Sequence, residues 1–166
     1  MRAVPRDATS DKALALAALG AELVAADVDD AASVQKTMEE AYGAFCVTFF
    51  WHHFSADHEK KQAKNKAEGA KAAGLKHVIW STLEDTRQWI TLSDTRMPTL
   101  QEKHKMPHFD AKAEANHFFT DAGVPVTFLY ASFYWENLIF LAPAPSAVRM
   151  VCSTSRFRWA IKNSPA

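Results

Sequence analysis

Lys112 and Ser81 are two side chains of this sequence that suit work on a bound carbonyl or sugar hydroxyl. Lys112 lies in a stretch with helical spacing of apolar residues, where its ammonium group could polarise a carbonyl or hold a ribose hydroxyl. A solvated surface lysine is the alternative. Ser81 ends an apolar run and could donate a hydrogen bond in a reductase site. It lacks the G-x-S-x-G turn of a hydrolase nucleophile.

Polar and aromatic residues gather where several apolar runs end. In a parallel sheet, the carboxyl ends of the strands meet at one edge, and such folds bind ligands there. Arg6 follows the first run, where an arginine suits an adenosine 2′-phosphate; a solvated arginine is the alternative. The other groups at such ends are Asp27 with Val28, Thr48–Trp51, Ser81 with Thr82, and Ser132–Asn137.

Two further clusters allow a functional and a structural interpretation. One consists of aromatic residues that could flank a flat ligand ring, although packing is the commoner use of such rings. Its members are Phe49, Phe50, Trp51 and Phe54. The other is a lysine run predicted to form a solvated helix face, with a phosphate contact from one member as the alternative. Its members are Lys60, Lys61, Lys64 and Lys66.

The sequence gives no sign of a metal centre. His52, His53 and His58 are not joined by cysteines in a ligand pattern, and His104 with His108 lacks a completing carboxylate. Cys46 lies in an apolar run and is predicted to be a buried, reduced thiol. The formal net charge is +0, and no apolar run reaches membrane-spanning length. We therefore expect neither nucleic acid nor membrane as a partner, and a cytoplasmic, possibly also nuclear, location.

The elements that position these residues alternate along the chain. Five predicted strands cover residues 1–7, 21–28, 44–51, 75–82 and 124–131, and predicted helices cover 10–20, 30–43, 55–73 and 108–122. Strands separated by helices or long connections indicate a doubly wound parallel α/β sheet. A polar connection, residues 84–106, precedes the last helix. Residues 142–166 have no periodicity and are predicted to be a divergent, poorly ordered tail.

Local signals predict how these elements begin, end and pack. Thr9 or Ser10 is predicted to cap the first helix, Asp30 the second, and Gly43 and Gly74 to end the helices before them. The apolar pattern of the first helix predicts Leu14, Leu16 and Leu19 facing inward. The β-branched and aromatic run of residues 124–131 predicts a strand covered on both faces.

Six segments resemble the NmrA-like family, atypical members of the short-chain dehydrogenase/reductase superfamily. They are "RAVPRD", "GAELVAADVDD", "GAFCVTFFW", "AAGLKHVIWSTLED", "HFDAKAEANHFFTDAGVPVT" and "FYWENL". Together they follow the family order over residues 1–141, which we interpret as a partial NAD(P)-binding Rossmann domain.

The resemblance implies a site for NADP(H) and a role for each matching residue. It places Arg6 to Ser10 near the 2′-phosphate, Asp27 with Val28 beside the adenine, and Thr48 to Phe50 along the ribose and nicotinamide. Lys61 would add a contact and Lys112 would approach the nicotinamide ribose. The loop formed by Tyr134, Trp135, Glu136 and Asn137 would close the pocket.

Three departures from the family pattern shape the functional prediction. The opening strand and its Gly-rich phosphate loop are absent, so we expect a domain truncated at its first βα unit, with weak or lost NADP(H) binding. His108 stands where the reductase Tyr-x-x-x-Lys pair has its tyrosine. An unrelated tail follows residue 141. We expect a non-catalytic NADP(H)-responsive regulator that acts through a protein partner or homodimer. The alternatives are an NADPH-dependent reductase of a small carbonyl substrate and a cofactor-free fragment.

Overall fold

The computed structural model describes residues 1–131 of the 166-residue chain. Its strands are β1 (Arg2–Ala3), β2 (Glu22–Leu23), β3 (Gly43–Cys46), β4 (His77–Thr82) and β5 (Val126–Tyr130). Its α-helices are α1 (Asp11–Ala18), α2 (Ala31–Met38), α3 (Ala56–Ala72), α4 (Pro107–Glu114) and α5 (Asn116–Ala122). Two 3₁₀ turns are η1 (Phe50–His52) and η2 (Thr86–Gln88). The predicted boundary at residue 141 and the predicted tail lie outside the described residues.

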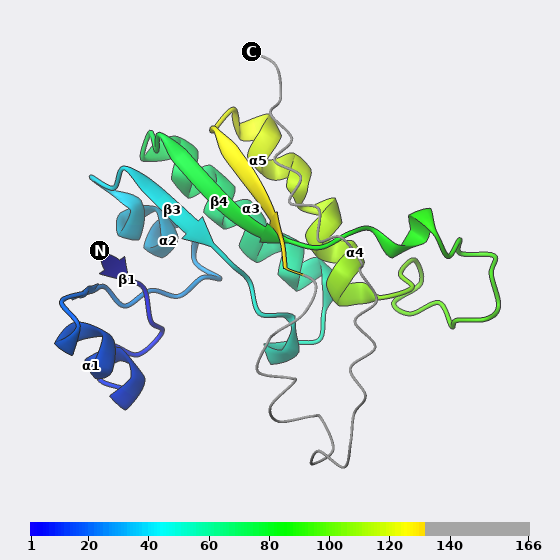
Figure 1. Cartoon of the computed structure of the whole chain (residues 1–166), viewed down its shortest axis with the longest axis horizontal. Helices are drawn as coiled ribbons and strands as arrows, with labels where there is room; N and C mark the ends of the chain where they lie inside the picture. The colour runs from blue at the N-terminus through cyan, green and yellow to red at the C-terminus, as the bar shows by residue number, and fades with distance from the viewer. Residues whose placement is uncertain (132–166) are drawn as a thin grey trace, which may run out of the picture.

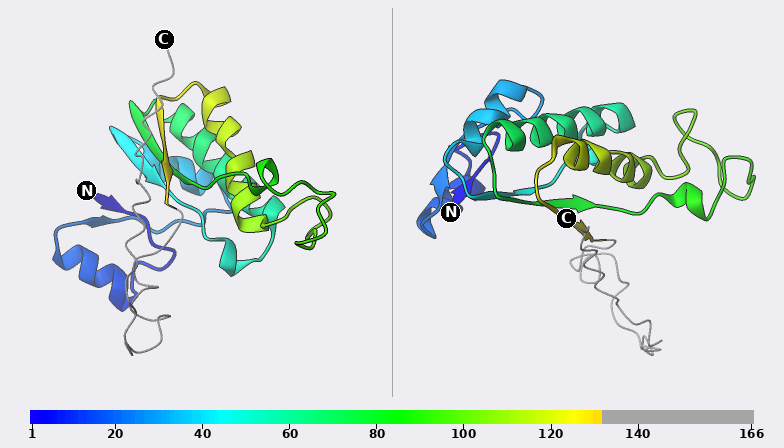
Figure 2. Two further views of the ribbon diagram at one scale, coloured as in Figure 1. Left: turned by 45° about the vertical axis from the view of Figure 1, so that its right-hand side comes forward. Right: turned by 90° about the horizontal axis from the view of Figure 1, so that it is seen from above.

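β3, β4 and β5 form a three-stranded parallel sheet in that order. Each connection carries helices, α3 between β3 and β4, and α4 with α5 between β4 and β5, which is the βαβ unit of an α/β fold. Figure 2 shows α3, α4 and α5 on one side of this sheet. The predicted parallel α/β class is confirmed.

β1 and β2 form a second, two-stranded parallel sheet. Within the described part of the chain, β1 pairs only with β2 and β3 pairs only with β4, so β1 and β3 each keep one unpaired edge. Arg2 links the two parts, because its guanidinium donates to the carbonyl oxygens of Thr37 and Glu39 after α2.

The core lies between the three-stranded sheet and its helices. Trp80 on β4 is fully buried and stacks on Phe119 of α5, with 4.8 Å between ring centroids. The indole Nε1 donates to Asn116 Oδ1 at 3.0 Å. The face of α3 toward the sheet is made of small residues, Ala63, Ala67 and Ala70, which lets the helix approach closely.

The predicted boundaries of α3 are confirmed. The residues that start and end this helix act through local contacts, which a sequence reveals. The Ser55 side chain accepts a hydrogen bond from the His58 backbone N–H, and the chain turns with a positive φ at Gly74. The last helix is not continuous as predicted: Ala115 separates α4 from α5. The strand predicted over residues 124–131 is β5, which pairs only with β4 among residues 1–131 and has half-buried side chains in that part of the chain, apart from the exposed Tyr130.

The predicted helix stop at Gly43 is wrong. α2 ends at Met38, and Glu40 makes the turn with a φ of 60°. Gly43 instead begins β3, where a Cβ atom would lie 2.6 Å from the His77 carbonyl oxygen on β4. The glycine is required by the close approach of two strands. β3 is also shorter than predicted, since Phe50 and Trp51 lie in η1.

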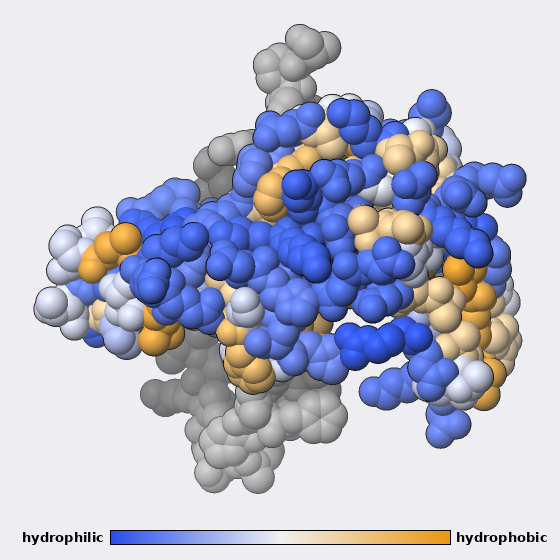
Figure 3. All heavy atoms as spheres, turned by 180° about the vertical axis from the view of Figure 1, so that it is seen from behind, coloured by the Kyte–Doolittle hydropathy of each residue, from blue (hydrophilic) through white to orange (hydrophobic). Residues whose placement is uncertain are grey.

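The predicted inward leucines of α1 are exposed. Leu14, Leu16 and Leu19 are 52%, 42% and 86% exposed, and only Ala13 of α1 is buried. α1 lies beside the two-stranded sheet, away from the helices that cover β3–β5 (Figure 1). Seen from behind, the molecule is mostly hydrophilic, with apolar side chains gathered at the end that carries α1 (Figure 3). An apolar stripe is buried only where a facing surface exists.

Candidate functional site

A cavity of about 350 Å³ opens where β1, β2 and β3 end. Its apolar wall consists of Val4, Ala26, Val28, Val47 and Phe49, and its polar lining of Arg6, Thr48, His52, Gln62 and Lys66. Such a volume and mixed lining suit a small organic ligand. The cavity lies at the carboxyl ends of parallel strands, which is the expected position in this fold class.

Four of the predicted cofactor residues line this cavity: Arg6, Val28, Thr48 and Phe49. Five others do not line the cavity, namely Ser10, Asp27, Phe50, Lys61 and Lys112, and neither does the catalytic candidate Ser81. The predicted closing loop of Tyr134, Trp135, Glu136 and Asn137 lies outside the described residues. The cavity thus brings together residues from the ends of three strands.

The turn after β1 is held by its own side chains. Asp7 Oδ1 accepts from the backbone N–H and the hydroxyl of Thr9, and Ser10 Oγ donates to the Asp7 carbonyl oxygen. Ser10 occupies the N-cap position of α1 but its side chain makes no capping hydrogen bond, so the predicted cap is only positional. Arg6 is exposed at the cavity rim, with Nη1 2.8 Å from His52 Nε2.

Lys112 is buried, so its interpretation as a solvated lysine is wrong. Its ammonium group donates to Thr48 Oγ1 at 2.9 Å and to the Thr48 carbonyl oxygen at 3.1 Å. It also lies 3.2 Å from Glu59 Oε1 and 5.0 Å from the Trp80 ring centroid. Burial lowers the pKa of Lys112, and the Glu59 carboxylate opposes that shift.

Glu59 on α3 is the centre of this buried cluster. It is fully buried, and its Oε1 also accepts from the Thr48 hydroxyl. Its Oε2 lies 3.4 Å from His53 Nε2, close enough for an ion pair but without hydrogen-bond geometry. Lys112 and Glu59 together fix Thr48, which lines the cavity. The cluster therefore connects α4 to the site through one strand end.

His108, the other catalytic candidate, lies four residues before Lys112 among aromatic rings. Its ring centroid is 4.8 Å from that of Trp51 and 5.7 Å from that of Phe50. Burial lowers the pKa of His108 below its ordinary value, which favours the neutral imidazole. Ser81 contributes its carbonyl oxygen, 3.4 Å from the Lys112 ammonium.

Sequence reasoning missed two polar residues on the inner face of α3, Glu59 and Gln62. Both are buried, as is Lys66, so the prediction that Lys66 belongs to a solvated face is wrong. Lys60 is half-buried and pairs with Asp57 and Glu114, while Lys61 and Lys64 are exposed as predicted. The usable signal was spacing: positions 59, 62 and 66 share a helix face with the buried alanines 63, 67 and 70.

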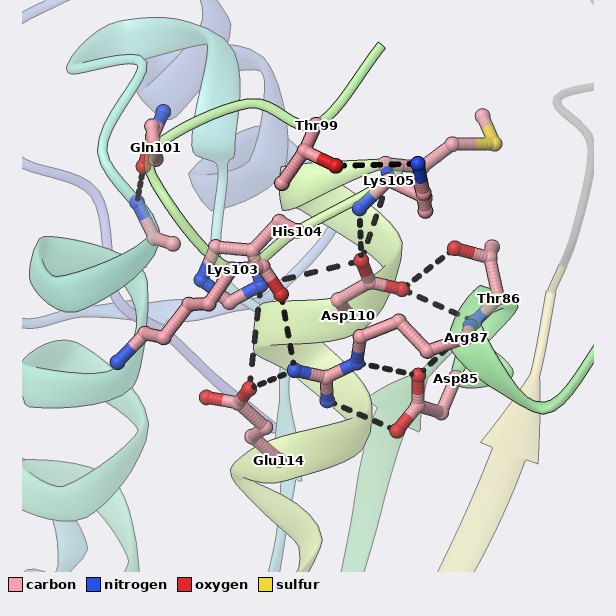
Figure 4. A network of polar contacts seen from close by, with 12 residues as sticks. Asp85, Thr86, Arg87, Thr99, Gln101, Lys103, His104, Lys105, Asp110 and Glu114 are labelled. Carbon is pink, nitrogen blue, oxygen red and sulfur yellow. Dashed lines mark hydrogen bonds and ion pairs between the residues drawn. The ribbon is translucent and has the colours of Figure 1, made fainter. Parts of the chain in front are cut away.

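A second polar network fixes the connection between β4 and α4 (Figure 4). The Arg87 guanidinium makes two hydrogen bonds of 2.8 Å to the Asp85 carboxylate and one of 2.7 Å to Glu114 Oε1. The buried Asp110 carboxylate accepts from Thr86 and from the backbone N–H groups of Lys105 and Met106. The network anchors the helix that carries Lys112.

We expect this network to make stability depend on acid. Hydrogen bonds from Arg87 lower the pKa of Asp85 below 3.8, and Lys60 with Arg87 outweighs burial to lower the pKa of Glu114 below 4.5. The pKa values of both carboxyl groups are lower in the folded state than in the unfolded state. Their contribution to the free energy of unfolding is therefore complete at pH values above the ordinary pKa values, and it is lost as the pH falls through the folded-state pKa values. Arg87→Met should cost about 1–2 kcal/mol near neutral pH.

The measurement is urea unfolding of the wild type and Arg87→Met over a pH series. The difference in unfolding free energy should shrink as the pH falls from about 5 to about 2. A difference that stays constant through this range would show that the carboxylates do not depend on Arg87. Arg96→Met is the matched control, because Arg96 is exposed and, within residues 1–131, forms an ion pair only with Asp94.

Residues 1–131 contain neither a candidate metal site nor a candidate membrane span. No cluster of three or more histidine, cysteine or acidic residues in this part of the chain could hold a metal ion. None of its helices is both long enough and apolar enough to cross a membrane.

Several solved structures share the fold at low sequence identity. The chain matches triphenylmethane reductase from Citrobacter sp., complexed with NADP(H), with a TM-score of 0.65 and 19% identity over 83% of this chain and 42% of that chain. It matches NADPH-dependent quinone oxidoreductase QOR2 from Escherichia coli with a TM-score of 0.62 and 23% identity over 84% and 42%. It matches NmrA, a negative transcriptional regulator, with a TM-score of 0.64 and 24% identity over 80% of this chain and 38% of that chain. These likenesses show the Rossmann-like fold.

Sequence comparison reaches the family level. The NmrA-like family domain-containing oxidoreductase himF of Aspergillus japonicus is 32% identical over 91 residues, which are 49% of this chain and 26% of himF. The chain therefore spans under half the length of the relatives described here. The family model of the NmrA-like family matches residues 1–161. This match covers nearly the whole sequence and agrees with the fold, and the chain belongs to the NmrA-like family.

Proposed function

We propose that this chain binds NADP(H) in the cavity at the ends of β1, β2 and β3, and acts as a non-catalytic regulator that responds to cofactor occupancy. The observation that carries the proposal is the cavity itself, with Arg6 at its rim and the Thr48 wall held by Lys112 and Glu59. The family membership and the NADP(H)-bound triphenylmethane reductase support the choice of cofactor.

The residues present fit the cofactor in chemistry. Arg6 offers a guanidinium group for the 2′-phosphate, and Val28 with Phe49 offers apolar surface for flat rings. When bound, the cofactor would supply a hydride or, in a regulator, a redox-dependent charge difference. Lys112 would approach the ribose, Asp27, Ser10, Phe50 and Lys61 would flank the site, and Tyr134 to Asn137 would close it.

The non-catalytic assignment is supported by the surroundings of His108 and Lys112. The ammonium group of Lys112 is directed at protein acceptors, and the His108 ring packs against Trp51 and Phe50. A reductase of a small carbonyl substrate is the second candidate, favoured by the buried Lys112 beside the Ser81 carbonyl oxygen. Loss of nicotinamide absorbance during incubation with a quinone would identify it. The proposed regulator acts through a protein partner or a second copy of this chain, and it is located in the cytoplasm or the nucleus.

The test is a thermal melt with NADPH and with NADH. A ligand that binds only the folded state raises stability by about 2.7 kcal/mol at one hundred times its dissociation constant. We expect a clear rise in Tm with NADPH and a smaller one with NADH. Arg6→Ala should weaken NADPH binding about tenfold or more by removing a charge-assisted contact. Arg96→Ala should leave the rise unchanged, and absence of any shift in the wild type would overturn the proposal.

A further inference from the structure

His104 is a buried histidine on the connection between η2 and α4, outside the lining of the cavity (Figure 4). The residue is fully buried, and neither ring nitrogen makes a hydrogen bond within residues 1–131. Its backbone forms an isolated antiparallel bridge with Leu100, in which the N–H of each residue donates to the carbonyl oxygen of the other. A ring without partners is costly in the interior, and because the ring titrates, a change of pH can act on the fold at this point.

The carboxylates nearest His104 already have other donors. Nδ1 lies 3.8 Å from Asp110 Oδ2 and 3.8 Å from Glu114 Oε1, beyond hydrogen-bonding distance. Asp110 Oδ2 accepts from two backbone N–H groups, and Glu114 Oε1 accepts from Arg87 at 2.7 Å. A proton added to His104 would therefore create a charged, buried N–H group that the described residues leave without an acceptor.

Protonation of His104 is disfavoured while the connection is closed. Burial lowers the pKa of His104 below its ordinary value of 6.5. Carboxylates oppose this shift and cations add to it. The charged groups around the ring are Asp57 and Lys60 of α3, Asp85 and Arg87 after β4, Asp110 and Glu114 of α4, and Lys103 and Lys105 on its own segment.

The direction of the pH effect follows from this lowered pKa. The closed connection binds fewer protons than an open one in which the ring is hydrated. His104 therefore does not weaken the closed state at pH values above 6.5, and opening becomes easier as the pH falls from 6.5 toward the folded-state pKa.

Residues 99–105, which we call the strap, also hold the segment that follows β3. Gln101 Nε2 donates to the Phe54 carbonyl oxygen at 2.8 Å, and Gln101 Oε1 accepts from the Ala56 backbone N–H at 2.9 Å. Gln101, Glu102 and Phe54 have φ angles of 46°, 65° and 53°, in the left-handed region that residues with side chains rarely adopt. The backbone is thus strained on both sides of this contact, and the strain is relieved when the contact is lost.

The Gln101 contact reaches the cavity through η1. The Phe54 backbone N–H donates to the Phe50 carbonyl oxygen at 2.8 Å, which closes the turn. Phe49 and His52 of the same turn line the cavity. Consecutive contacts therefore join the strap to one wall of the cavity.

We propose that the strap is a pH-sensitive regulator of the cavity: protonation of His104 opens the strap, frees Gln101 from the segment after β3 and loosens the wall that this segment forms. The inference rests on the proposed function for the ligand of the cavity. For the device itself it rests on the buried ring and on the two Gln101 hydrogen bonds. Ligand affinity is then highest near neutral pH and falls in mild acid.

The test is amide hydrogen exchange of the full chain, measured by NMR from about pH 7.5 to about pH 5.5 and corrected for intrinsic rates. The reporters are the amides of His104, Ala56 and Phe54, whose hydrogen bonds belong to the strap and to the turn that it holds. In the wild type, their opening constants should rise by up to about tenfold per pH unit as the pH falls below 6.5.

Variants assign this rise to His104. His104→Phe has no titrating ring and removes no side-chain hydrogen bond of the described structure, so the rise should vanish. His104→Leu is a second variant of smaller volume and should give the same result. His117→Gln is the matched control, because His117 is exposed on α5, and it should keep the rise. Burial also lowers the pKa of His53 and His108, so the comparison of variants identifies the group.

Isothermal titration with NADPH measures the consequence for the ligand. The loss of affinity between about pH 7.5 and about pH 5.5 should be at least about threefold larger in the wild type than in His104→Phe. Gln101→Ala should bind NADPH about threefold or more weakly at the higher pH, because the wall is loosened without protonation. Gln88→Ala removes an exposed glutamine that does not contact the turn and should bind as the wild type does.

Three results would overturn the inference while the proposed function stands. One is exchange that is independent of pH in the wild type or equally pH-dependent in His104→Phe. Another is opening at His104 without opening at Ala56 and Phe54. The third is an equal loss of NADPH affinity in the wild type and His104→Phe. A wild type that binds no NADPH at either pH would overturn the proposed function, and exchange at Ala56 and Phe54 would still decide the inference.

Discussion

Lys112→Met is expected to lower the free energy of unfolding by about 3–5 kcal/mol, because it leaves the Glu59 carboxylate buried without its cation. The carboxylate is fully buried, and its remaining neighbours are the Thr48 hydroxyl and the His53 ring. The loss should appear as a lower urea midpoint with an unchanged m-value in circular dichroism. Thr48 should also lose its fixed position at the cavity wall.

A double variant separates the pair from the rest of the site. Glu59→Gln with Lys112→Met removes both charges, so its loss should be smaller than the sum of the two single losses. Lys64→Met serves as the control for removing an exposed lysine and should change stability by less than about 0.5 kcal/mol. Losses that add without interaction would show that Lys112 and Glu59 act independently.

Trp80→Ala is expected to cost about 3–5 kcal/mol, because it opens a cavity in the middle of the core. The side chain is fully buried, stacks on Phe119 and donates a hydrogen bond to Asn116. It also lies under the Lys112 ammonium group, so the variant should affect the site as well as the core. Thermal unfolding followed by circular dichroism measures the loss.

Two other tryptophan variants serve as references for the stability loss expected of Trp80→Ala. Trp80→Phe keeps a stacked ring and leaves the Asn116 side-chain oxygen unpaired, so its cost should be about 1–2 kcal/mol. Trp89→Ala removes a residue that is 63% exposed and should change stability by less than about 0.5 kcal/mol. A Trp80→Ala loss as small as that of Trp89→Ala would contradict the described core.

The features that were predictable from sequence are those with local causes. Ser55 caps α3 and Asp30 caps α2 through hydrogen bonds within three residues, so their types and positions were sufficient. The alternation of strands and helices likewise sufficed for the parallel α/β class. Arg6 and Thr48 were found because a strand end is a local feature of the sequence.

The features that were missed depend on groups far along the chain. Gly43 is required by the carbonyl oxygen of His77, and the leucines of α1 are exposed because no described surface faces them. Glu59 and Lys66 lie in a helix rich in charged residues, where the sequence alone suggests that charged side chains are exposed to solvent. Only the distant Thr48 and Lys112 show that this face of α3 is buried, and spacing alone was the available hint.

The division into two sheets has a consequence for cooperativity. β3, β4 and β5 with their helices contain most of the core, whereas β1, β2 and α1 are attached through contacts such as those of Arg2, Arg6 and Asn65. The N-terminal unit can therefore open locally while the other unit stays folded, and its amides should exchange with solvent first. One wall of the cavity belongs to each unit. A bound ligand that touches both walls would act as a clamp and convert a two-step unfolding into a single transition.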